Sequence, residues 1–241
     1  MYFCYFAHFR NPPGGSKRVG ADERWAIEEI VARVEGLTRA LIHYPVPEGA
    51  THAFPHDEPA PPCVLQLYAP AIETLENALR PKGRLQELVA AGAGTGLHAL
   101  KLQQQMMLVR RLAIAPLDAS QHLAPGSCSY LVHYPGQAAD LSAWHRHYID
   151  SHPPIMRKFP NVREIEICTR LDWIGGLPGM RVDFMQRNKL RFDTASDLSA
   201  ALASPVIKEM RADFHTFPDF AGGNVHYPML TQSVALPSAS Q

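Results

Sequence analysis

The chain has 241 residues, 46% of them hydrophobic, which is enough for a substantial buried core and fits two domains of ordinary size. Lysine plus arginine equals aspartate plus glutamate at 23 each, so a nucleic-acid partner is not expected, because phosphate recognition needs a concentrated cationic excess. No apolar run approaches the roughly 18 residues that a membrane span requires, and a membrane partner is not expected either.

Four cysteines are spread along the chain without a Cys-x-x-Cys pair, so neither a zinc knuckle nor a dithiol redox motif is expected. Each lies in a stretch that is typical of a β-strand, where a free cysteine usually packs as a small hydrophobic residue. These features favour a reduced, cytoplasmic location. The cysteines are Cys4, Cys63, Cys128 and Cys168.

The first half of the chain alternates strand-like and helix-like segments. Its apolar start is short and has neither a basic leader nor a small-residue cleavage site, which favours a strand over a signal sequence. Asp22 is expected to cap the first helix, whose apolar face would include Trp25, and Pro81 is expected to interrupt the second helix. The Pro- and His-rich insertion Pro45–Pro62 is expected to be a surface loop. The predicted strands are Tyr2–Phe9, Leu37–Tyr44, Val64–Ala69 and Leu100–Ala113, and the predicted helices are Asp22–Val34 and Ile72–Ala91.

The second half repeats this order after a predicted linker at 117–127, which contains Pro125 and polar residues and directly follows Pro116. Pro153 and Pro154 are expected to end its first helix, which would leave His152 in the last turn. Pro205 is expected to break or kink its second helix. The predicted strands are Cys128–Tyr134, Val162–Asp172, Arg181–Phe192 and Asn224–Val234, and the predicted helices are Leu141–Lys158 and Ala195–Phe214.

The repeated element order predicts an α+β fold made of two tandem ferredoxin-like βαββαβ repeats, at 1–116 and 128–241. Each repeat would leave one face of an antiparallel sheet bare, and the simplest partner for that face is the sheet of the other repeat. The two sheets would close within one chain into a dimeric α/β-barrel arrangement. Such a barrel could hold a ligand in its interior, and an interior filled by side chains is the alternative.

Three segments of the second half resemble the EthD family of the dimeric α/β-barrel superfamily. In Trp144–Val162, an aromatic residue is followed one turn later by His and then Pro. Asn188–Pro205 resembles the strand–helix signature of the family, and Met210–Phe220 carries Asp213 and a phenylalanine at the usual separation. The first half shows a weaker echo in Val64–Leu79, and its first helix has no histidine. The resemblance implies one intact site in the C-terminal repeat and a degenerate N-terminal repeat.

The superfamily includes cofactor-free isomerases, lyases, dehydratases, cyclases and monooxygenases, together with some haem enzymes. EthD-like proteins are often associated with the degradation of ethers or aromatic compounds. The resemblance therefore implies a small hydrophobic or aromatic substrate rather than a particular reaction. It also favours a homodimer, although tandem repeats could satisfy their sheets within one chain and leave a monomer.

The helix predicted from Leu141 carries the candidate catalytic residues. At about 100° per residue, Trp144, His145, Tyr148 and His152 share one face, and an amphipathic helix buries its aromatic face. We expect His152 to be the general acid/base, because an imidazole pKa of about 6.5 allows proton transfer in both directions near neutrality. Tyr148 would donate to a substrate oxygen, with Trp144 and His145 as candidate substrate-binding residues. The alternative is that His152 bonds a free carbonyl at its own helix end.

Three tyrosines are candidate walls of the substrate pocket. Tyr130 and Tyr134 lie on one face of the strand Cys128–Tyr134, because side chains alternate along a strand. Tyr227 lies in the last strand, which is expected to be the neighbour of Cys128–Tyr134 in the sheet. The sequence does not decide which sheet face lines the barrel, so these residues either bind the substrate or belong to the core.

The histidines of this helix do not predict a metal site. His145 and His147 face opposite sides, and His145 and His152 are two turns, or about 10 Å, apart. Zinc ligands must instead converge to within about 3 to 4 Å of one another. Glycine-rich nucleotide motifs and a Walker loop are also absent from the sequence. No cofactor or metal is therefore expected.

These observations lead to one hypothesis and two alternatives. The leading hypothesis is a cofactor-independent lyase, dehydratase or isomerase that uses histidine acid–base chemistry on a hydrophobic, aromatic small molecule in catabolism. The first alternative is a cofactor-free monooxygenase of an aromatic substrate. The second is a small-molecule-binding protein without catalytic activity.

Overall fold

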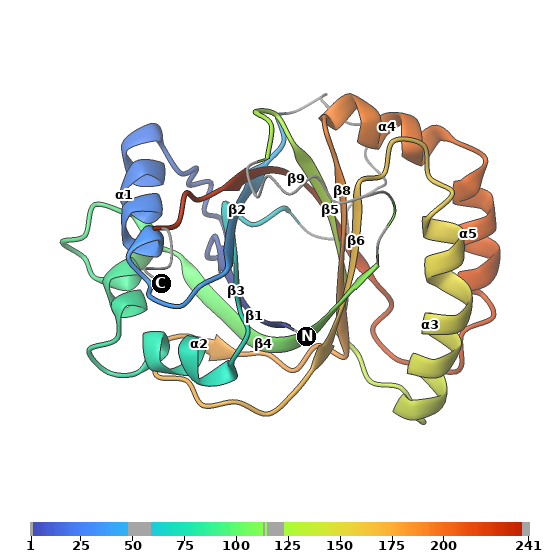
Figure 1. Cartoon of the computed structure of the whole chain (residues 1–241), viewed down its shortest axis with the longest axis horizontal. Helices are drawn as coiled ribbons and strands as arrows, with labels where there is room; N and C mark the ends of the chain where they lie inside the picture. The colour runs from blue at the N-terminus through green and yellow to red at the C-terminus, as the bar shows by residue number, and fades with distance from the viewer. Residues whose placement is uncertain (1, 48–58, 113, 115–122, 238–241) are drawn as a thin grey trace.

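Eight antiparallel strands form a closed barrel in the computed structural model, which describes residues 2–47, 59–112, 114 and 123–237 (Figure 1). The strand order is β1-β3-β2-β9-β5-β8-β6-β4, and pairing of β1 with β4 closes the barrel. The short strand β7 adds to β4 in parallel. The strands are β1 (Tyr2–Arg10), β2 (Arg39–Pro45), β3 (Cys63–Ala69), β4 (Lys101–Leu112), β5 (Cys128–Tyr134), β6 (Glu164–Arg170), β7 (Met180–Arg181), β8 (Gln186–Phe192) and β9 (Val225–Ser233).

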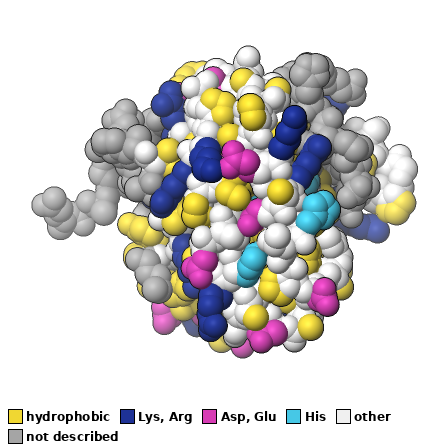
Figure 2. Space-filling model, turned by 90° about the vertical axis from the view of Figure 1, so that its right-hand side faces the viewer, with side chains coloured by type: hydrophobic (Ala, Val, Ile, Leu, Met, Phe, Trp, Pro, Cys, Tyr) yellow, Lys and Arg dark blue, Asp and Glu magenta, His cyan; other side chains and the backbone are white. Residues whose placement is uncertain are grey.

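Helices cover the barrel on two opposite sides (Figure 1). The helices of the first half lie on one side and those of the second half on the other. On the outer face above the second group, cationic, acidic and histidine side chains are interspersed with hydrophobic ones (Figure 2). No helix in the described part of the chain combines the length and hydropathy needed to cross a membrane. The helices are α1 (Ala21–Ala32), α2 (Ile72–Leu79), the 3-10 helices η1 (Arg84–Val89) and η2 (Leu97–Ala99), α3 (Leu141–Met156), α4 (Ala195–Ala203) and α5 (Val206–Phe214).

Each barrel strand is buried on both faces, and the two faces meet different environments. In β5, Tyr130 and Tyr134 pack in the cluster formed with the helices of the second half. Leu131 and His133 alternate with them and therefore face the barrel interior. Tyr130 on β5 pairs with Pro228 on β9, which confirms that β5 and β9 are neighbours. Tyr130 and Tyr134 thus lie on the helix-covered face of the sheet, a point that the sequence alone did not decide.

The barrel interior is rich in buried polar side chains. Lys189 on β8 is a buried cation of this interior. Its ammonium lies 2.9 Å from a Glu166 carboxylate oxygen and 2.8 Å from the Tyr68 hydroxyl. Such groups remain buried because each hydrogen-bonds to another. The buried polar and charged residues of the interior include His8, His43, Gln66, Gln105, Ser129, His133, Glu164, Glu166, Arg187, Lys189 and Thr231.

The helix α3 corrects one prediction that bears on the site. It does not end at Pro153 and Pro154 but continues to Met156. A proline lacks the N–H that would bond to the residue four positions earlier, so Pro153 and Pro154 remove two helical hydrogen bonds without ending the helix. The N–H of Arg157 still bonds to the carbonyl of Pro153 at 3.1 Å. His152 therefore lies one turn before the helix end rather than in the last turn.

Other element boundaries also differ from the sequence-based ones. The strand predicted at Arg181–Phe192 is divided, because β7 pairs with β4 whereas β8 pairs with β5 and β6. α1 is capped at Gly20 instead of Asp22, with the Gly20 N–H bonded to Glu23, and Trp25 is 66% exposed rather than part of the apolar face. The breaks expected at Pro81 and Pro205 are confirmed, since α2 and α4 end just before them. Most of the predicted insertion and linker lies outside the described residues.

Candidate functional site

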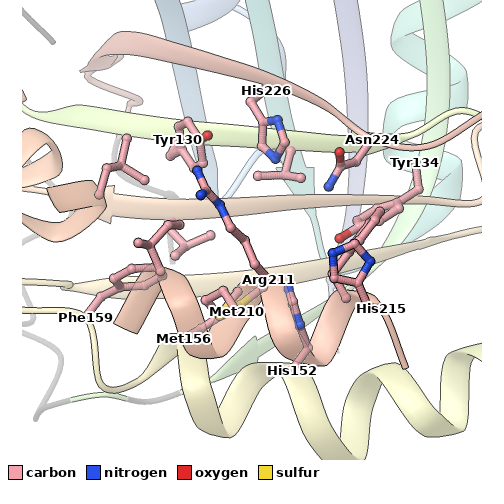
Figure 3. Close-up of a pocket in the computed structure, with 15 residues that line it drawn as sticks. Tyr130, Tyr134, His152, Met156, Phe159, Met210, Arg211, His215, Asn224 and His226 are labelled. Atoms are coloured by element: carbon pink, nitrogen blue, oxygen red, sulfur yellow. The ribbon is translucent and has the colours of Figure 1, made fainter. Parts of the chain in front are cut away.

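A pocket of about 310 Å³ lies between the sheet of the second half and the helices α3 and α5 (Figure 3). It is on the helix-covered side of the strands, so it is not the barrel-interior pocket that the sequence suggested. Side chains from β5 and β9 form one wall, and side chains from α3 and α5 form the other. The lining residues are Tyr130, Val132, Tyr134, His152, Met156, Phe159, Leu190, Leu202, Ile207, Met210, Arg211, Phe214, His215, Asn224 and His226.

His152 and Asp213 form a short hydrogen bond at the helix side of this pocket. Nδ1 of His152 lies 2.6 Å from Oδ2 of Asp213, a residue of α5. A carboxylate accepts, so Nδ1–H donates and Nε2 is the nitrogen available to a ligand. Burial lowers the pKa of His152, and the hydrogen bond with Asp213 opposes part of that decrease. The imidazole is therefore neutral near pH 7, in the form that can accept a proton.

Aromatic rings hold this pair in place. The Phe217 ring packs at 73° against the imidazole of His152, with the ring centroids 5.1 Å apart. Tyr148, one turn earlier on α3, also packs against the imidazole, with the ring centroids 4.9 Å apart. The Tyr148 ring stacks on that of Trp144, with the centroids 5.1 Å apart. Both Tyr148 and Trp144 are fully buried. The aromatic face of α3 predicted from helical spacing thus forms the support of His152.

Hydroxyl and amide groups connect this support to the pocket wall. Nδ2 of Asn188 donates to the Tyr148 hydroxyl at 2.6 Å. Hydrogen bonds with Tyr148 and Asn224 lower the pKa of Tyr134, against a larger increase caused by burial. Tyr134 and Asn224 line the pocket, whereas Tyr148 lies behind them. Tyr134 is thus a polar residue of the pocket wall, and its ring packs against that of Tyr148, with the centroids 5.7 Å apart.

The strand wall also carries a stacked aromatic pair. The rings of Tyr130 and His226 are 5.3 Å apart and nearly parallel, at 16°. Arg211 extends from α5 across the pocket towards them (Figure 3). Flat aromatic surfaces combined with a few polar groups are typical of sites for small aromatic molecules.

The structure brings together only part of the predicted set. Tyr130, Tyr134 and His152 line the pocket, and Tyr148 and Trp144 pack directly behind it. His145 is half-buried outside the pocket lining, and burial lowers its pKa. Tyr227 faces the barrel interior, where its hydroxyl accepts from Arg10 at 3.0 Å.

Several residues of the site were not identified from the sequence. Asp213 was noted only as part of a motif, and its contact with His152 joins residues 61 positions apart. His226 lies next to Tyr227, and strand alternation alone would have placed it on the same side as Tyr130 once β5 and β9 were paired. Arg211 and Asn224 gave no recognisable signal. In the part of the chain that the structure describes, no group of three His, Cys, Asp or Glu residues is arranged to hold a metal ion.

No family model matches the sequence, and no curated protein is significantly similar to it. Solved structures do match. An anthrone oxidase-like protein superimposes with a TM-score of 0.57 at 14% identity, covering 100% of this chain and 96% of that one. A protein of Lactobacillus acidophilus NCFM described as a "putative monooxygenase" superimposes with a TM-score of 0.51 at 9% identity, covering 95% and 93% of the two chains.

These two matches show the fold: a barrel of the dimeric α/β-barrel type. An EthD family protein of Bacillus halodurans C-125 also matches, at 20% identity over 42% of this chain and 95% of that one, with a TM-score of 0.35. That score is too low to support an argument. The resemblance to the EthD family rests on the sequence motifs of the second half.

Proposed function

We propose that the protein is an enzyme that binds a small hydrophobic, aromatic molecule in this pocket and uses His152 as its general base. The observation that carries the proposal is the 2.6 Å contact between His152 Nδ1 and Asp213 Oδ2 at the pocket wall. A histidine held by a carboxylate in one tautomer, with the other nitrogen available, is the arrangement that general-base catalysis needs.

The environment of His152 supports proton abstraction. Because burial lowers its pKa, the imidazole is unprotonated before the substrate reacts. When it accepts a proton, the adjacent Asp213 carboxylate stabilises the imidazolium, as the effect of that hydrogen bond on the pKa indicates. The apolar surroundings, including Met156 and Phe159, keep water away and strengthen this interaction.

The opposite wall supplies the groups that would orient the substrate. The Tyr134 hydroxyl would donate to a hydroxyl or carbonyl oxygen, and Tyr148 would position Tyr134 through their hydrogen bond. In this way Tyr148 contributes to catalysis without touching the substrate. The stacked rings of Tyr130 and His226 would pack against an aromatic ring.

Proton transfer of this kind suits a cofactor-independent lyase, dehydratase or isomerase, which is the reaction class we favour. Cofactor-free oxygenation is the second candidate, because it also begins with deprotonation of an electron-rich aromatic compound. The names of the two structural neighbours, an anthrone oxidase-like protein and a monooxygenase, favour this second candidate. Oxygen consumption during turnover distinguishes the two.

No haem is expected in this pocket. Its volume of about 310 Å³ lies at the small end of the range of about 300 to 1,000 Å³ for small-molecule and cofactor sites. We therefore expect the purified protein to show no Soret absorption band, and addition of haemin to leave its melting temperature unchanged.

We also infer that residues 1–116 and 128–241 are tandem ferredoxin-like repeats and that the protein assembles as a homodimer. The element order in the two halves supports the first point, with β7 as an addition in the second half. Light scattering coupled to size-exclusion chromatography tests the second point, since a mass near 26.7 kDa would instead indicate a monomer.

A thermal-shift screen tests the proposed function. The panel contains naphthols, anthrones, aromatic ketones, ethers and lactones, and a ligand that binds the native state raises the melting temperature. We expect a hit whose shift is reduced in Met156→Trp, which fills the pocket from α3. The matched control is Ile155→Trp, on the same helix but outside the pocket lining. A shift that is equal in wild type and Met156→Trp would place the ligand elsewhere and contradict the proposal.

A further inference from the structure

The barrel interior contains an arginine whose charge is compensated by no carboxylate among the described residues. Arg187 on β8 is completely buried, on the opposite face of the sheet from the His152 pocket. It is independent of the proposed function, because none of its contacts involves a residue that lines that pocket. Buried arginines are normally paired with carboxylates, since an unpaired buried charge is costly.

An accounting of its five N–H groups shows which are satisfied. Nη1 lies 2.9 Å from Nε2 of His8 and 3.1 Å from Nδ1 of His133. Nε donates to Oε1 of Gln105 at 3.1 Å. The two N–H groups of Nη2 are buried and have no hydrogen-bond partner among the described residues. One edge of the guanidinium therefore remains available to an acceptor.

The partners of Arg187 do not neutralise it. Burial, followed by the nearby charge of Arg187, keeps the pKa values of His8 and His133 well below 6.5, so both imidazoles are neutral acceptors. Burial lowers the pKa of Arg187 to about 9, and the guanidinium still carries a full charge near pH 7. Arg10 adds a second positive charge in the vicinity, since it acts on the pKa values of both His133 and Arg187.

Lys189, two residues along the same strand face, shows the contrast. Its ammonium lies 2.9 Å from a Glu166 oxygen and 3.2 Å from a Glu164 oxygen. Within the described chain, the same interior thus places Lys189 against two carboxylates, which it shares with Arg39 and Arg111, and places none against Arg187. Phe184 and Phe6 pack over the Arg187 guanidinium, at 4.3 Å and 5.4 Å from their ring centroids, and shield it from water.

We propose that the barrel interior binds a compact monoanion on Nη2 of Arg187, either a halide or a short carboxylate such as acetate. Both ligands accept N–H hydrogen bonds and supply the missing negative charge. The bound anion would stabilise the folded barrel by compensating a charge that the chain itself leaves unpaired.

Thermal unfolding of the full chain tests the proposal. The protein is transferred into sodium gluconate, whose anion is too bulky for this interior, and chloride or acetate then replaces gluconate at constant ionic strength. We expect a saturable rise in melting temperature with at least one of them. A response to chloride alone identifies a halide site, and a response to acetate identifies a carboxylate site. The absence of a saturable rise with either anion would overturn the proposal.

Variants connect the response to Arg187. Arg187→Gln should lose the saturable rise, whereas Arg39→Gln should retain it, because Arg39 is a barrel-facing arginine already paired with Glu164 at 2.7 Å. An equal response in Arg187→Gln would contradict the proposal. If that variant does not fold and chloride gives the rise, wild-type crystals soaked in bromide provide the test; if acetate gives it, difference density for acetate at the same place replaces the anomalous signal. An anomalous peak at hydrogen-bond distance from Nη2 of Arg187 is expected, and peaks confined to the protein surface would overturn the assignment.

Discussion

Nδ1 of His152 on α3 lies 2.6 Å from Oδ2 of Asp213 on α5, although the two residues are 61 positions apart in the sequence. The contact joins the two helices that cover the second half of the barrel. It determines which imidazole nitrogen can reach a ligand, and it makes Asp213 the residue whose alteration should have the clearest catalytic effect.

Replacement of Asp213 by asparagine should lower kcat/KM for a substrate found in the screen by about 10²- to 10⁴-fold. The amide preserves the size of the side chain but favours the wrong tautomer of His152 and cannot stabilise the imidazolium. Steady-state kinetics measures the change. Asp219→Asn, an exposed position near the same helix end, should keep the wild-type value. Equal kinetics of the two variants would show that Asp213 has no catalytic role.

The Tyr148–Tyr134 pair gives a second prediction. Tyr134→Phe should reduce kcat/KM about tenfold, the equivalent of one hydrogen bond to the substrate. Tyr148→Phe should instead destabilise the fold by about 1 to 3 kcal/mol, because it leaves the buried Asn188 amide without its acceptor. Urea unfolding and kinetics, measured on both variants, separate the two effects. If Tyr134→Phe leaves kcat/KM unchanged, its hydroxyl does not contact the substrate.

Buried histidines should make the fold sensitive to acid. Burial lowers the pKa of His43 to about 3, from about 6.5 in the unfolded chain, so the unfolded state binds the proton more readily. The contribution of His43 to stability is therefore complete above about pH 6.5 and decreases as the pH falls from there towards 3. The slope should be up to about 1.4 kcal/mol per pH unit for each such histidine.

His43→Gln tests this dependence, because glutamine can still bond to Thr231 and Gln66 but does not titrate. Urea unfolding at several values between about pH 4 and pH 8 should give a shallower slope for the variant than for wild type. His98→Gln, at a histidine on the surface, should keep the wild-type slope. A wild-type stability that does not change between pH 7 and pH 5 would contradict the prediction.

The ion pairs of the barrel interior should contribute more to the free energy of unfolding than those of the surface. Lys189→Met leaves Glu164 and Glu166 buried with less compensation, and it should lower the free energy of unfolding by about 3 to 5 kcal/mol. Lys158→Met removes an exposed pair with Glu209 and should cost about 0 to 1 kcal/mol. Chemical denaturation measures both changes. Similar values for the two variants would mean that the interior network contributes little.

Much of the barrel could be predicted from local patterns. The β5 segment shows why: its seven residues are all buried, and its aromatic and β-branched side chains suit a strand covered on both faces. Pro205 marked the break between α4 and α5 correctly, because a proline within a long helical pattern interrupts its hydrogen bonds. Pro153 and Pro154 gave a wrong boundary, because α3 continues past them to Met156 despite the two N–H groups that they lack.

The candidate site was only partly predictable. Helical spacing placed Trp144, Tyr148 and His152 on one buried face of α3, as the structure has them. The partner of His152 could not be derived, because Asp213 approaches only through the packing of α5 on α3. The pocket itself lies between the sheet and the helices rather than inside the barrel, and strand alternation alone cannot distinguish these two faces when both are buried.

The most direct test of the account is the turnover rate of a screen hit with wild type, His152→Gln and His147→Gln. His147 lies on the same helix as His152 but outside the pocket lining, where it bonds to Thr216, so its replacement controls for changes in α3. The account predicts that His152→Gln loses at least about a hundredfold in rate while His147→Gln stays close to wild type. Turnover by His152→Gln at the wild-type rate would contradict the central claim.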